Sequence, residues 1–165
     1  MNQVVLCLLI KENQILLGMK KRGFGKEKWN GSGGKQKGEE SLEEIAVRET
    51  QEEFNLEIEG KDLNRVAIID FYFKEKPEYS QRVHVFMVEK WKGEPQESEE
   101  MLPKWFGIGE IPYDQMWMDD KYWFPEVLSG RKIFGEFYFS GEGEGERIDK
   151  YEIKDISQAK EITEP

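Results

Sequence analysis

Cysteine, histidine and positive charge are all scarce in this sequence. Cys7 is the only cysteine among 165 residues, so the chain cannot form an intrachain disulfide, which suits a reducing compartment. We therefore predict a cytoplasmic location. Lysine and arginine together number 24, against 34 aspartate and glutamate residues, and the formal net charge is −10. Because the binding of DNA or RNA polymers needs a basic surface, this balance argues against a nucleic-acid polymer as partner.

Long apolar runs are missing as well. The first apolar run, residues 4–10, is too short to cross a bilayer and follows no basic leader, so we expect a core strand and no membrane partner. Hydrophobic residues still make up 38% of the chain and aromatic residues 13%, which is a globular composition. The length fits one domain. We expect that domain over residues 1–154, a polar and frayed tail over 155–165, and a monomer.

The periodicity of apolar residues predicts strands and helices in a mixed order. Strands are expected at residues 4–10, 14–20, 65–73, 82–91, 104–108, 132–139 and 148–153. Helices are expected over residues 41–54 and 119–128, and the glycine-rich segment 23–38 is expected to be a loop. The only histidine, His84, falls within a predicted strand, where we expect it to be packed or half-exposed rather than catalytic. This mixture predicts an α/β (α+β) fold around one sheet.

The first predicted helix carries signals at both of its ends. Ser41 followed by Glu44 is a capping-box pair, with Ser41 as the expected N-cap. Asn55 suits left-handed backbone just after the helix. In the second predicted helix, Pro125 would perturb the backbone if it lies beyond the first turn.

Three carboxylates share one face of the first predicted helix. Glu49, Glu52 and Glu53 stand at positions i, i+3 and i+4. Like charges this close repel each other, and either full solvation or a bound divalent cation relieves the repulsion. Ligands that are all oxygen favour Mg²⁺ or Mn²⁺ over zinc. Taken alone, such a row is more often a solvated acidic surface than a metal site. Arg48 lies beside it and could orient a carboxylate or contact phosphate.

The stretch from Gly34 to Leu56 resembles the Nudix box, G-x5-E-x7-R-E-U-x-E-E-x-G-U, in which U is aliphatic. The matching residues are Gly34, Glu40, Arg48, Glu49, Glu52, Glu53 and Leu56. Two positions depart from the pattern, because Thr50 stands at an aliphatic position and Asn55 at the second glycine. Neither departure removes a charged group, and Asn55 can still adopt a positive φ. A pattern with this many fixed positions is far more specific than a lone glycine motif.

The resemblance implies a Nudix fold, a mixed β-sheet sandwiched between helices, with a loop–helix–loop that holds divalent cations. Mg²⁺ is the expected cofactor, with Mn²⁺ as a possible substitute. The implied metal ligands are Glu49, Glu52, Glu53, Glu100 and the backbone carbonyl of Gly33 or Gly34. The implied catalytic residues are Glu53, which we expect to take the proton of the attacking water, and Glu52 and Arg48. Apart from the resemblance, Glu100 fits a solvated loop carboxylate equally well.

Further segments resemble the branch of this family that hydrolyses oxidised purine nucleoside triphosphates, the 8-oxo-dGTP diphosphatases. These segments are residues 17–25, 29–31, 83–86 and 116–125. The last of them, Met-Trp-Met-Asp-Asp-Lys-Tyr-Trp-Phe-Pro, is the most specific match. The resemblance covers nearly the whole chain, from about residue 4 to about residue 153, and 74–81 is among its weakest stretches.

The aromatic and polar residues of these segments suit a purine pocket. Trp117 with either Phe71 or Phe24 could sandwich a planar base, and stacking of this kind tolerates any base. Asn30 offers both a donor and an acceptor to the edge of a base. Lys20 could contact phosphate or could only carry a charge at a strand end. By composition alone, large aromatic residues belong more often to a core than to a ligand platform.

Asp119 and Asp120 are adjacent carboxylic acids in the most specific segment. If both face an apolar pocket, one should hold a proton near neutral pH. The pair could then donate one hydrogen bond and accept another, which matches the mixed edge of a purine. The alternative is that the pair caps the second helix.

The expected reaction is metal-dependent hydrolysis of an oxidised purine nucleoside triphosphate to the monophosphate and pyrophosphate, which would clean the nucleotide pool. One alternative is another small nucleotide substrate, such as ADP-ribose or a dinucleotide, because the departures at 74–81 fall where a pocket wall would lie. A second alternative is a non-catalytic nucleotide-binding module on the same scaffold. The presence of Glu49, Glu52 and Glu53 argues against that module.

Overall fold

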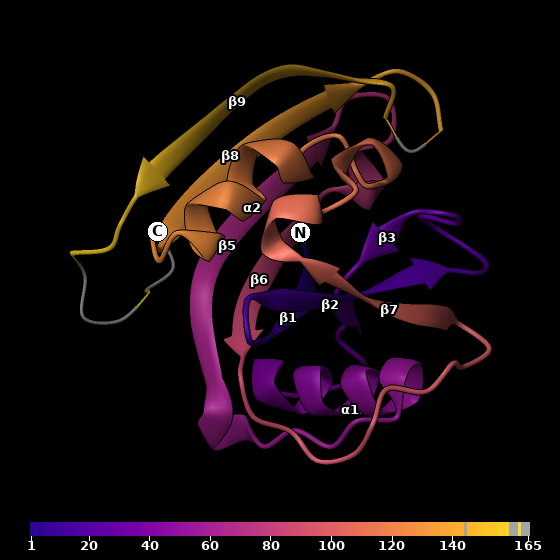
Figure 1. Cartoon of the computed structure of the whole chain (residues 1–165). Helices are drawn as coiled ribbons and strands as arrows, with labels where there is room; N and C mark the ends of the chain where they lie inside the picture. Colours follow the sequence, from indigo (N-terminus) through magenta and orange to yellow (C-terminus); the bar gives the residue numbers. More distant parts are fainter. Residues whose placement is uncertain (144, 159–161, 163–165) are drawn as a thin grey trace.

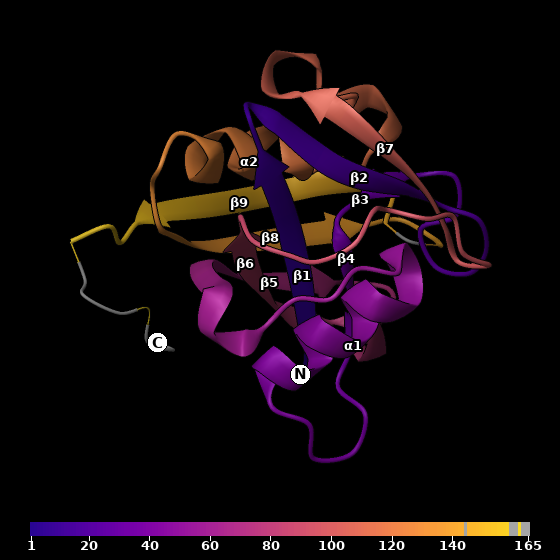
Figure 2. The same ribbon diagram turned by 60° about the horizontal axis from the view of Figure 1, so that its bottom comes forward.

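Within the described residues, 1–143, 145–158 and 162, the computed structural model has two α-helices packed on opposite faces of one mixed β-sheet (Figures 1 and 2). The strands are β1 (Asn2–Lys11), β2 (Gln14–Lys20), β3 (Trp29–Asn30), β4 (Ser32–Lys35), β5 (Leu63–Phe73), β6 (Gln81–Val88), β7 (Met101–Gly107), β8 (Ile133–Ser140) and β9 (Arg147–Asp155). The α-helices are α1 (Leu42–Phe54) and α2 (Asp120–Leu128). Short 3₁₀ helices are η1 (Gly60–Asp62), η2 (Pro77–Tyr79), η3 (Ile108–Glu110) and η4 (Tyr113–Gln115). The predicted fold class is confirmed.

The strands run in the order β3-β2-β1-β6-β5-β8-β9, with β4 paired to β1 and β7 paired to β2. The pairs β1–β6 and β5–β8 are parallel, whereas the remaining pairs are antiparallel. Lys11 faces Gln14 across the tight turn of the β1–β2 hairpin, as the sequence predicts. This topology puts β1 in the middle of the sheet and β4 directly beside it.

Alternation along β1 sends its side chains into two separate cores. Val5, Cys7 and Leu9 belong to the core between the sheet and α1. Leu6 and Leu8 belong to the core on the opposite face, which is covered by α2. Because both faces of the sheet are covered, the two helices and the loops at their ends are held on a rigid support.

The predicted ends of α1 are confirmed. The hydroxyl of Ser41 accepts a hydrogen bond from the backbone N–H of Glu44 at 3.1 Å. Asn55 ends the helix in the left-handed conformation, with φ of 58°. In the second helix, Pro125 lies inside α2 rather than in its first turn. The helix nevertheless continues to Leu128.

The prediction of a loop over residues 23–38 is wrong in part, because this segment contains β3 and β4. Its glycine-rich sequence has low strand propensity, yet β1 supplies backbone partners that pair Cys7 with Ser32 and Val5 with Gly34. Tertiary pairing also moves other boundaries. β6 ends at Val88 instead of residue 91, and β7 already begins at Met101 because it pairs with β2 along its whole length.

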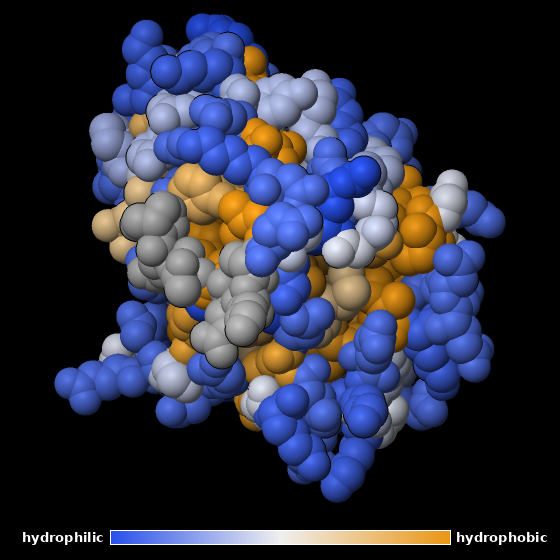
Figure 3. Space-filling view, turned by 90° about the vertical axis from the view of Figure 1, so that its left-hand side faces the viewer, coloured by the Kyte–Doolittle hydropathy of each residue, from blue (hydrophilic) through white to orange (hydrophobic). Residues whose placement is uncertain are grey.

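Of the C-terminal segment, β9 belongs to the sheet and Ile162 contacts β5. β9 runs to Asp155, one residue beyond the predicted domain edge at 154. Ile162 is 5% exposed, and Nη2 of Arg65 donates a hydrogen bond to its carbonyl oxygen at 2.6 Å. Residues 159–161 and 163–165 of the predicted tail lie outside the described residues. On the side that is at the left in Figure 1, hydrophobic side chains gather in a hollow that hydrophilic ones surround (Figure 3).

The single histidine is part of this packing. His84 is fully buried, and its Nε2 lies 2.7 Å from the side-chain oxygen of Gln3. The predicted packed position in a strand is therefore confirmed. Within the described residues, neither α1 nor α2 combines the length and apolarity that a membrane-crossing helix needs.

Candidate active site

The three glutamates of α1 differ greatly in their exposure. Glu53 is 5% exposed, whereas the side chain of Glu49 is 15% exposed and that of Glu52 is 49% exposed. The difference arises because the helix buries one side against the sheet, and Glu53 lies nearest to that side. The three side chains therefore range from the buried carboxyl of Glu53 to the solvent-exposed carboxyl of Glu52.

Glu53 is tied to the glycine-rich strand β4. The backbone N–H of Gly33 donates a hydrogen bond to its Oε1 at 2.8 Å. Burial raises the pKa of Glu53 to about 8, and the nearby charge of Glu49 adds to the rise, whereas the Gly33 N–H and the charge of Lys20 oppose it. A carboxyl whose pKa lies near neutral suits the role of proton acceptor in catalysis.

The close approach of β4 to α1 explains why glycine stands at two positions of this strand. A Cβ atom on Gly34 would lie 2.5 Å from Oε1 of Glu49. A Cβ atom on Gly33 would lie 2.0 Å from the carbonyl oxygen of Val5. A side chain at Gly33 would push β4 away from the backbone of β1, whereas one at Gly34 would displace the carboxyl group of Glu49.

Arg48 holds the neighbouring carboxylates together. Its Nε donates to Oε2 of Glu40 at 2.6 Å and its Nη2 donates to Oε1 of the same residue at 3.0 Å. Its Nη1 donates to Glu49 at 2.6 Å and to Glu52 at 3.4 Å. The guanidinium lowers the pKa of Glu40. These contacts support an orienting role for Arg48 rather than a phosphate contact.

Glu100 reaches the same region from the acidic loop. Oε1 of Glu100 accepts hydrogen bonds from Nη2 and Nε of Arg22 at 2.7 and 3.1 Å, and this partner lowers the pKa of Glu100. The hydroxyl of Ser98 donates to the carbonyl oxygen of Glu53 at 2.9 Å, so the loop is fastened to the end of α1. Glu100 is thus an ion-paired carboxylate near Glu53, and its role as a metal ligand stays a prediction.

The donor set near Glu53 suits a divalent cation in its chemistry. The candidate donors are carboxylate and backbone oxygens, which hard cations such as Mg²⁺ prefer. In the described residues, no three acidic, histidine or cysteine side chains lie close enough to hold a metal ion. Arg48 instead donates hydrogen bonds to the carboxylates of Glu49 and Glu52. The oxygen donors suit a divalent cation, but in this structure these two side chains are oriented to accept hydrogen bonds from Arg48.

A second constellation lies at the start of α2. Asp119 and Asp120 are only 4% and 3% exposed. The indole N–H of Trp123 donates to Oδ2 of Asp119 at 2.8 Å, while Oδ2 of Asp120 has no hydrogen-bond partner. Burial raises the pKa of both acids, and the neighbouring Asp119 raises that of Asp120 further, well above its usual value. The alternative reading is met in position only: Asp119 is the N-cap residue of α2 and Asp120 lies in its first turn, but the side chain of Asp119 makes no capping hydrogen bond.

The predicted aromatic platform is closed in this structure. The rings of Phe24 and Trp117 have centroids 4.9 Å apart, so no base fits between them unless Phe24 moves. Nζ of Lys28 lies 5.1 Å from the centroid of the Trp117 ring. Phe71 instead stacks on Phe137 at 5.6 Å within the core on the α2 side. Of the two predicted partners for Trp117, the structure places Phe24 against it.

Asn30 and Lys20 occupy neighbouring strands. Asn30 lies in β3, and its Oδ1 accepts a hydrogen bond from the backbone N–H of Gly31 at 2.9 Å. Lys20 ends β2, and its charge lowers the pKa values of both Glu53 and Glu100. Lys20 therefore lies close to the carboxylates, which favours a contact with a bound anion over an isolated surface charge.

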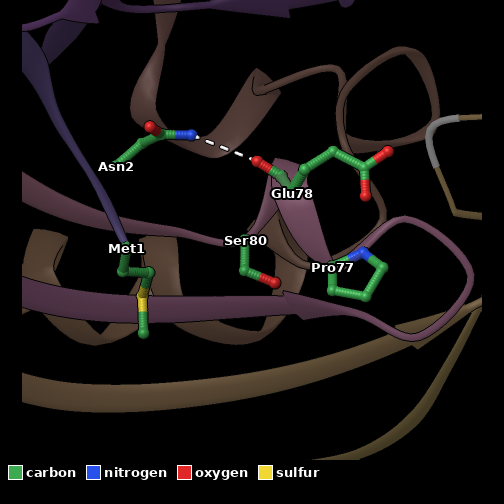
Figure 4. A pocket seen from close by; sticks show the side chains of 5 residues that line it. All are labelled: Met1, Asn2, Pro77, Glu78 and Ser80. Atoms are coloured by element: carbon green, nitrogen blue, oxygen red, sulfur yellow. Dashed lines mark hydrogen bonds between the residues drawn. The ribbon is translucent and has the colours of Figure 1, made fainter.

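Tyr79 was missed by the sequence analysis. Its ring meets that of Phe24 edge to face, with centroids 5.8 Å apart, so the loop between β5 and β6 borders the platform. The residues on both sides of Tyr79 line an open surface hollow of about 440 Å³, together with the first residues of β1 (Figure 4). Its lining is Met1, Asn2, Pro77, Glu78 and Ser80, none of which is a predicted site residue. The only signal in the sequence was the weak resemblance over 74–81.

Comparison with known proteins settles the class. The model of the NUDIX domain matches residues 1–127, so the chain belongs to the Nudix family. The oxidized purine nucleoside triphosphate hydrolase of Danio rerio is 44% identical over 138 residues, which are 84% of this chain and 86% of that protein. The protein of the same name from Mus musculus is 41% identical over 151 residues, 92% and 93% of the two chains.

Solved structures support the same fold. The MutT mutator protein of Bacillus halodurans superposes with a TM-score of 0.79 at 24% identity, covering 93% of this chain and 97% of that one. The predicted Nudix fold and the predicted family are thus confirmed. Nudix hydrolases need a divalent metal, which agrees with the donor chemistry of the glutamate row.

Proposed function

We propose that this protein hydrolyses oxidised purine nucleoside triphosphates to the monophosphate and pyrophosphate. The observation that carries the proposal is the buried pair of Asp119 and Asp120, in which one oxygen of Asp120 has no partner. An unpaired buried polar atom is costly, so such an atom points to a ligand that satisfies it. The names of the relatives from Danio rerio and Mus musculus support the same substrate class.

The chemistry of the acid pair suits an oxidised base. Oxidation at C8 of a purine changes N7 from a hydrogen-bond acceptor into a donor. Two carboxyl groups that share a proton can donate one hydrogen bond and accept another. Trp123 donates to Oδ2 of Asp119, while Oδ2 of Asp120 has no partner, so the pair still offers an oxygen to the base. The backbone N–H of Asp120 donates to the carbonyl of Trp117 at 3.0 Å, so the acids and the stacking ring belong to one turn.

We further propose Mg²⁺ as the natural cofactor, with Mn²⁺ as a substitute. Glu49, Glu52 and Glu53 would hold it, and when bound it would neutralise charge on the diphosphate and activate a water. Because Oε1 of Glu53 is bonded to the N–H of Gly33, its other oxygen is the one left to take a proton. Lys20 supplies positive charge beside this carboxylate.

The test is hydrolysis in the presence of Mg²⁺ across a panel of dGTP, 8-oxo-dGTP, 2-hydroxy-dATP, dATP, ADP-ribose and NADH. We expect the highest kcat/KM for the oxidised purines, with pyrophosphate as the second product. A preference for ADP-ribose or NADH would assign a different diphosphate substrate to the same family. Binding without turnover of any member would instead favour a regulatory module. The predicted cytoplasmic location and monomeric state belong to this proposal.

A further inference from the structure

Two buried hydroxyl groups lie behind the glutamate row, at a position where the sequence departs from the Nudix box. Thr50 stands where the box has an aliphatic residue, and it is fully buried, as is Ser32 of β4. Their hydroxyl oxygens are 2.8 Å apart. A buried aliphatic side chain would fill the space without needing a partner, whereas a buried hydroxyl must have one. The hydrogen bond therefore joins α1 to β4 by a contact that an aliphatic residue cannot make.

This hydrogen bond lies next to the one that holds Glu53. Ser32 directly precedes Gly33, whose N–H donates to Glu53 at 2.8 Å. Thr50 and Glu53 stand at positions i and i+3 of α1, so they share one side of the helix. The Ser32–Thr50 and Gly33–Glu53 hydrogen bonds therefore connect the same two elements at adjacent points.

The side of β4 that pairs with β1 leaves the strand little room to shift. It pairs with β1 over Val4–Cys7, and a Cβ atom at Gly33 would lie only 2.0 Å from the carbonyl oxygen of Val5. Because β1 fixes β4, the contacts between β4 and α1 decide where the helix lies. Packed side chains alone allow small shifts of a helix, while a short directional hydrogen bond limits them.

We propose that Ser32 and Thr50 are positioning residues, whose hydrogen bond fixes α1 against β4 and so keeps the N–H of Gly33 on the carboxylate of Glu53. Through this contact the pair sets the orientation of Glu53 during catalysis. The catalytic consequence rests on the proposed function, whereas the structural link between the two hydrogen bonds does not.

The test compares Thr50→Val, which keeps the shape of the side chain but removes the hydroxyl, with Thr50→Ser, which keeps the hydroxyl. Amide hydrogen exchange at Gly33, measured by NMR on the full chain, reports the hydrogen bond to Glu53 without any substrate. In Thr50→Val we expect this exchange to be about tenfold faster, and kcat to fall about tenfold with KM unchanged, because small misplacements of a catalytic group are costly. Thr50→Ser should restore both values.

The double variant Ser32→Ala with Thr50→Val separates positioning from stability. Removal of one hydroxyl leaves the other with only the thiol of Cys7 as a side-chain partner, whereas removal of both leaves only that weakly polar thiol, so the double variant should regain thermal stability. We expect it to keep the fast exchange at Gly33 and the low kcat. The matched control is Ser140→Ala, which removes a buried hydroxyl that donates to Asp149 at 2.8 Å, remote from the glutamates. It should change neither Gly33 exchange nor kcat.

Wild-type exchange at Gly33 in Thr50→Val would overturn the proposal, and so would recovery of kcat in the double variant. The kinetic arm uses whichever nucleotide the wild type hydrolyses fastest in the panel. If the wild type prefers another nucleotide, the proposed substrate fails while the exchange at Gly33 still decides the positioning role.

Discussion

Glu52 and Glu53 are neighbours in the chain, yet the fold gives their carboxyl groups very different surroundings. The side chain of Glu52 is 49% exposed, whereas Glu53 is 5% exposed. Burial disfavours a charged carboxylate, and this is the main reason why the pKa of Glu53 rises to about 8. At the residue scale, burial therefore distinguishes Glu53, whose carboxyl can exchange a proton near neutral pH, from its solvent-exposed neighbour.

The first prediction concerns the proton that Glu53 is expected to accept. Glu53→Gln keeps the shape of the side chain and an oxygen for the N–H of Gly33, but it cannot accept a proton. We expect kcat to fall by about 10²- to 10⁴-fold while the fold is kept, and steady-state kinetics with circular dichroism measures both. Glu43→Gln is the matched control, since Glu43 is an exposed carboxylate in the first turn of the same helix. Full activity of Glu53→Gln would refute the assignment of this residue.

A second prediction at the residue scale uses pH. Burial raises the pKa values of Asp119 and Asp120 in the folded chain, and the charge of Asp119 raises that of Asp120 further. In the unfolded chain they return to about 3.9. The folded form therefore holds the extra proton, so its contribution to stability is complete below about pH 4 and is lost as the pH rises through the folded pKa.

Asp120→Asn removes this titration. We expect the Tm of the wild type to fall relative to the Tm of Asp120→Asn as the pH rises from about 4 to 7. Thermal melts of both proteins at matched ionic strength measure the difference. A difference in Tm that does not change with pH would show that the pair does not share a proton in the folded protein.

At the scale of elements, α1 depends on a residue in left-handed conformation at its end. Asn55 adopts φ of 58°, and its Oδ1 accepts a hydrogen bond from Nε2 of Gln51 at 2.8 Å. The consensus box has glycine here, which reaches this conformation without strain. The departure from the box therefore preserves the geometry of the helix end.

Substitutions at this position should rank by backbone preference. We expect Asn55→Ala to lower the free energy of unfolding by about 1 kcal/mol, because alanine is strained at positive φ, and Asn55→Gly to leave it within about 0.5 kcal/mol of the wild type. Urea denaturation with equal m-values tests this order. If alanine proves as stable as glycine, the end of α1 does not depend on the left-handed residue.

The elements with local signals could be predicted from the sequence. The caps of α1 and the β1–β2 hairpin are encoded by neighbouring residues, and both are confirmed. β3 and β4 could not be predicted, because glycine-rich sequence becomes a strand only when β1 and β2 offer their backbones. The early start of β7 at Met101 has the same cause, since its partner β2 is far away in the sequence.

The candidate site, like the fold, could be predicted from the sequence only in part. The spacing of the glutamates in α1 predicts their shared face, but not that Glu53 alone is buried. The sequence left Phe71 and Phe24 as equal partners for Trp117, and only the folded chain separates them, because Phe71 stacks on Phe137 in the core. Tyr79 reaches Phe24 from a loop with no motif of its own, so no local signal could have found it.

At the scale of the whole molecule, the acidic surface and the anionic substrate must be reconciled. The net charge of −10 repels a triphosphate at long range. Locally, Lys20 lies beside Glu53 and Lys28 lies over Trp117. In the proposed function, cations held by the glutamate row offset its own charge. We therefore expect metal to be essential for binding the diphosphate and unnecessary for folding, since neither hydrophobic core includes these carboxylates.

Removal of metal tests whether the cation is needed for turnover but not for folding. EDTA should abolish turnover while far-UV circular dichroism stays unchanged, and added Mg²⁺ should restore activity fully. Full turnover in EDTA would contradict a metal-dependent mechanism. Unfolding in EDTA would instead show that the cation is part of the structure.

Recognition of an oxidised purine by the buried acid pair is best tested with two substrates. The measurement is the ratio of kcat/KM for 8-oxo-dGTP to kcat/KM for dGTP, made with Mg²⁺ in the wild type and in Asp119→Asn. We predict a ratio of at least about tenfold in the wild type, which corresponds to about 1.4 kcal/mol of discrimination. In Asp119→Asn the ratio should fall towards one. A wild-type ratio near one, or a high ratio that survives the substitution, would contradict the recognition of an oxidised purine by the buried acid pair.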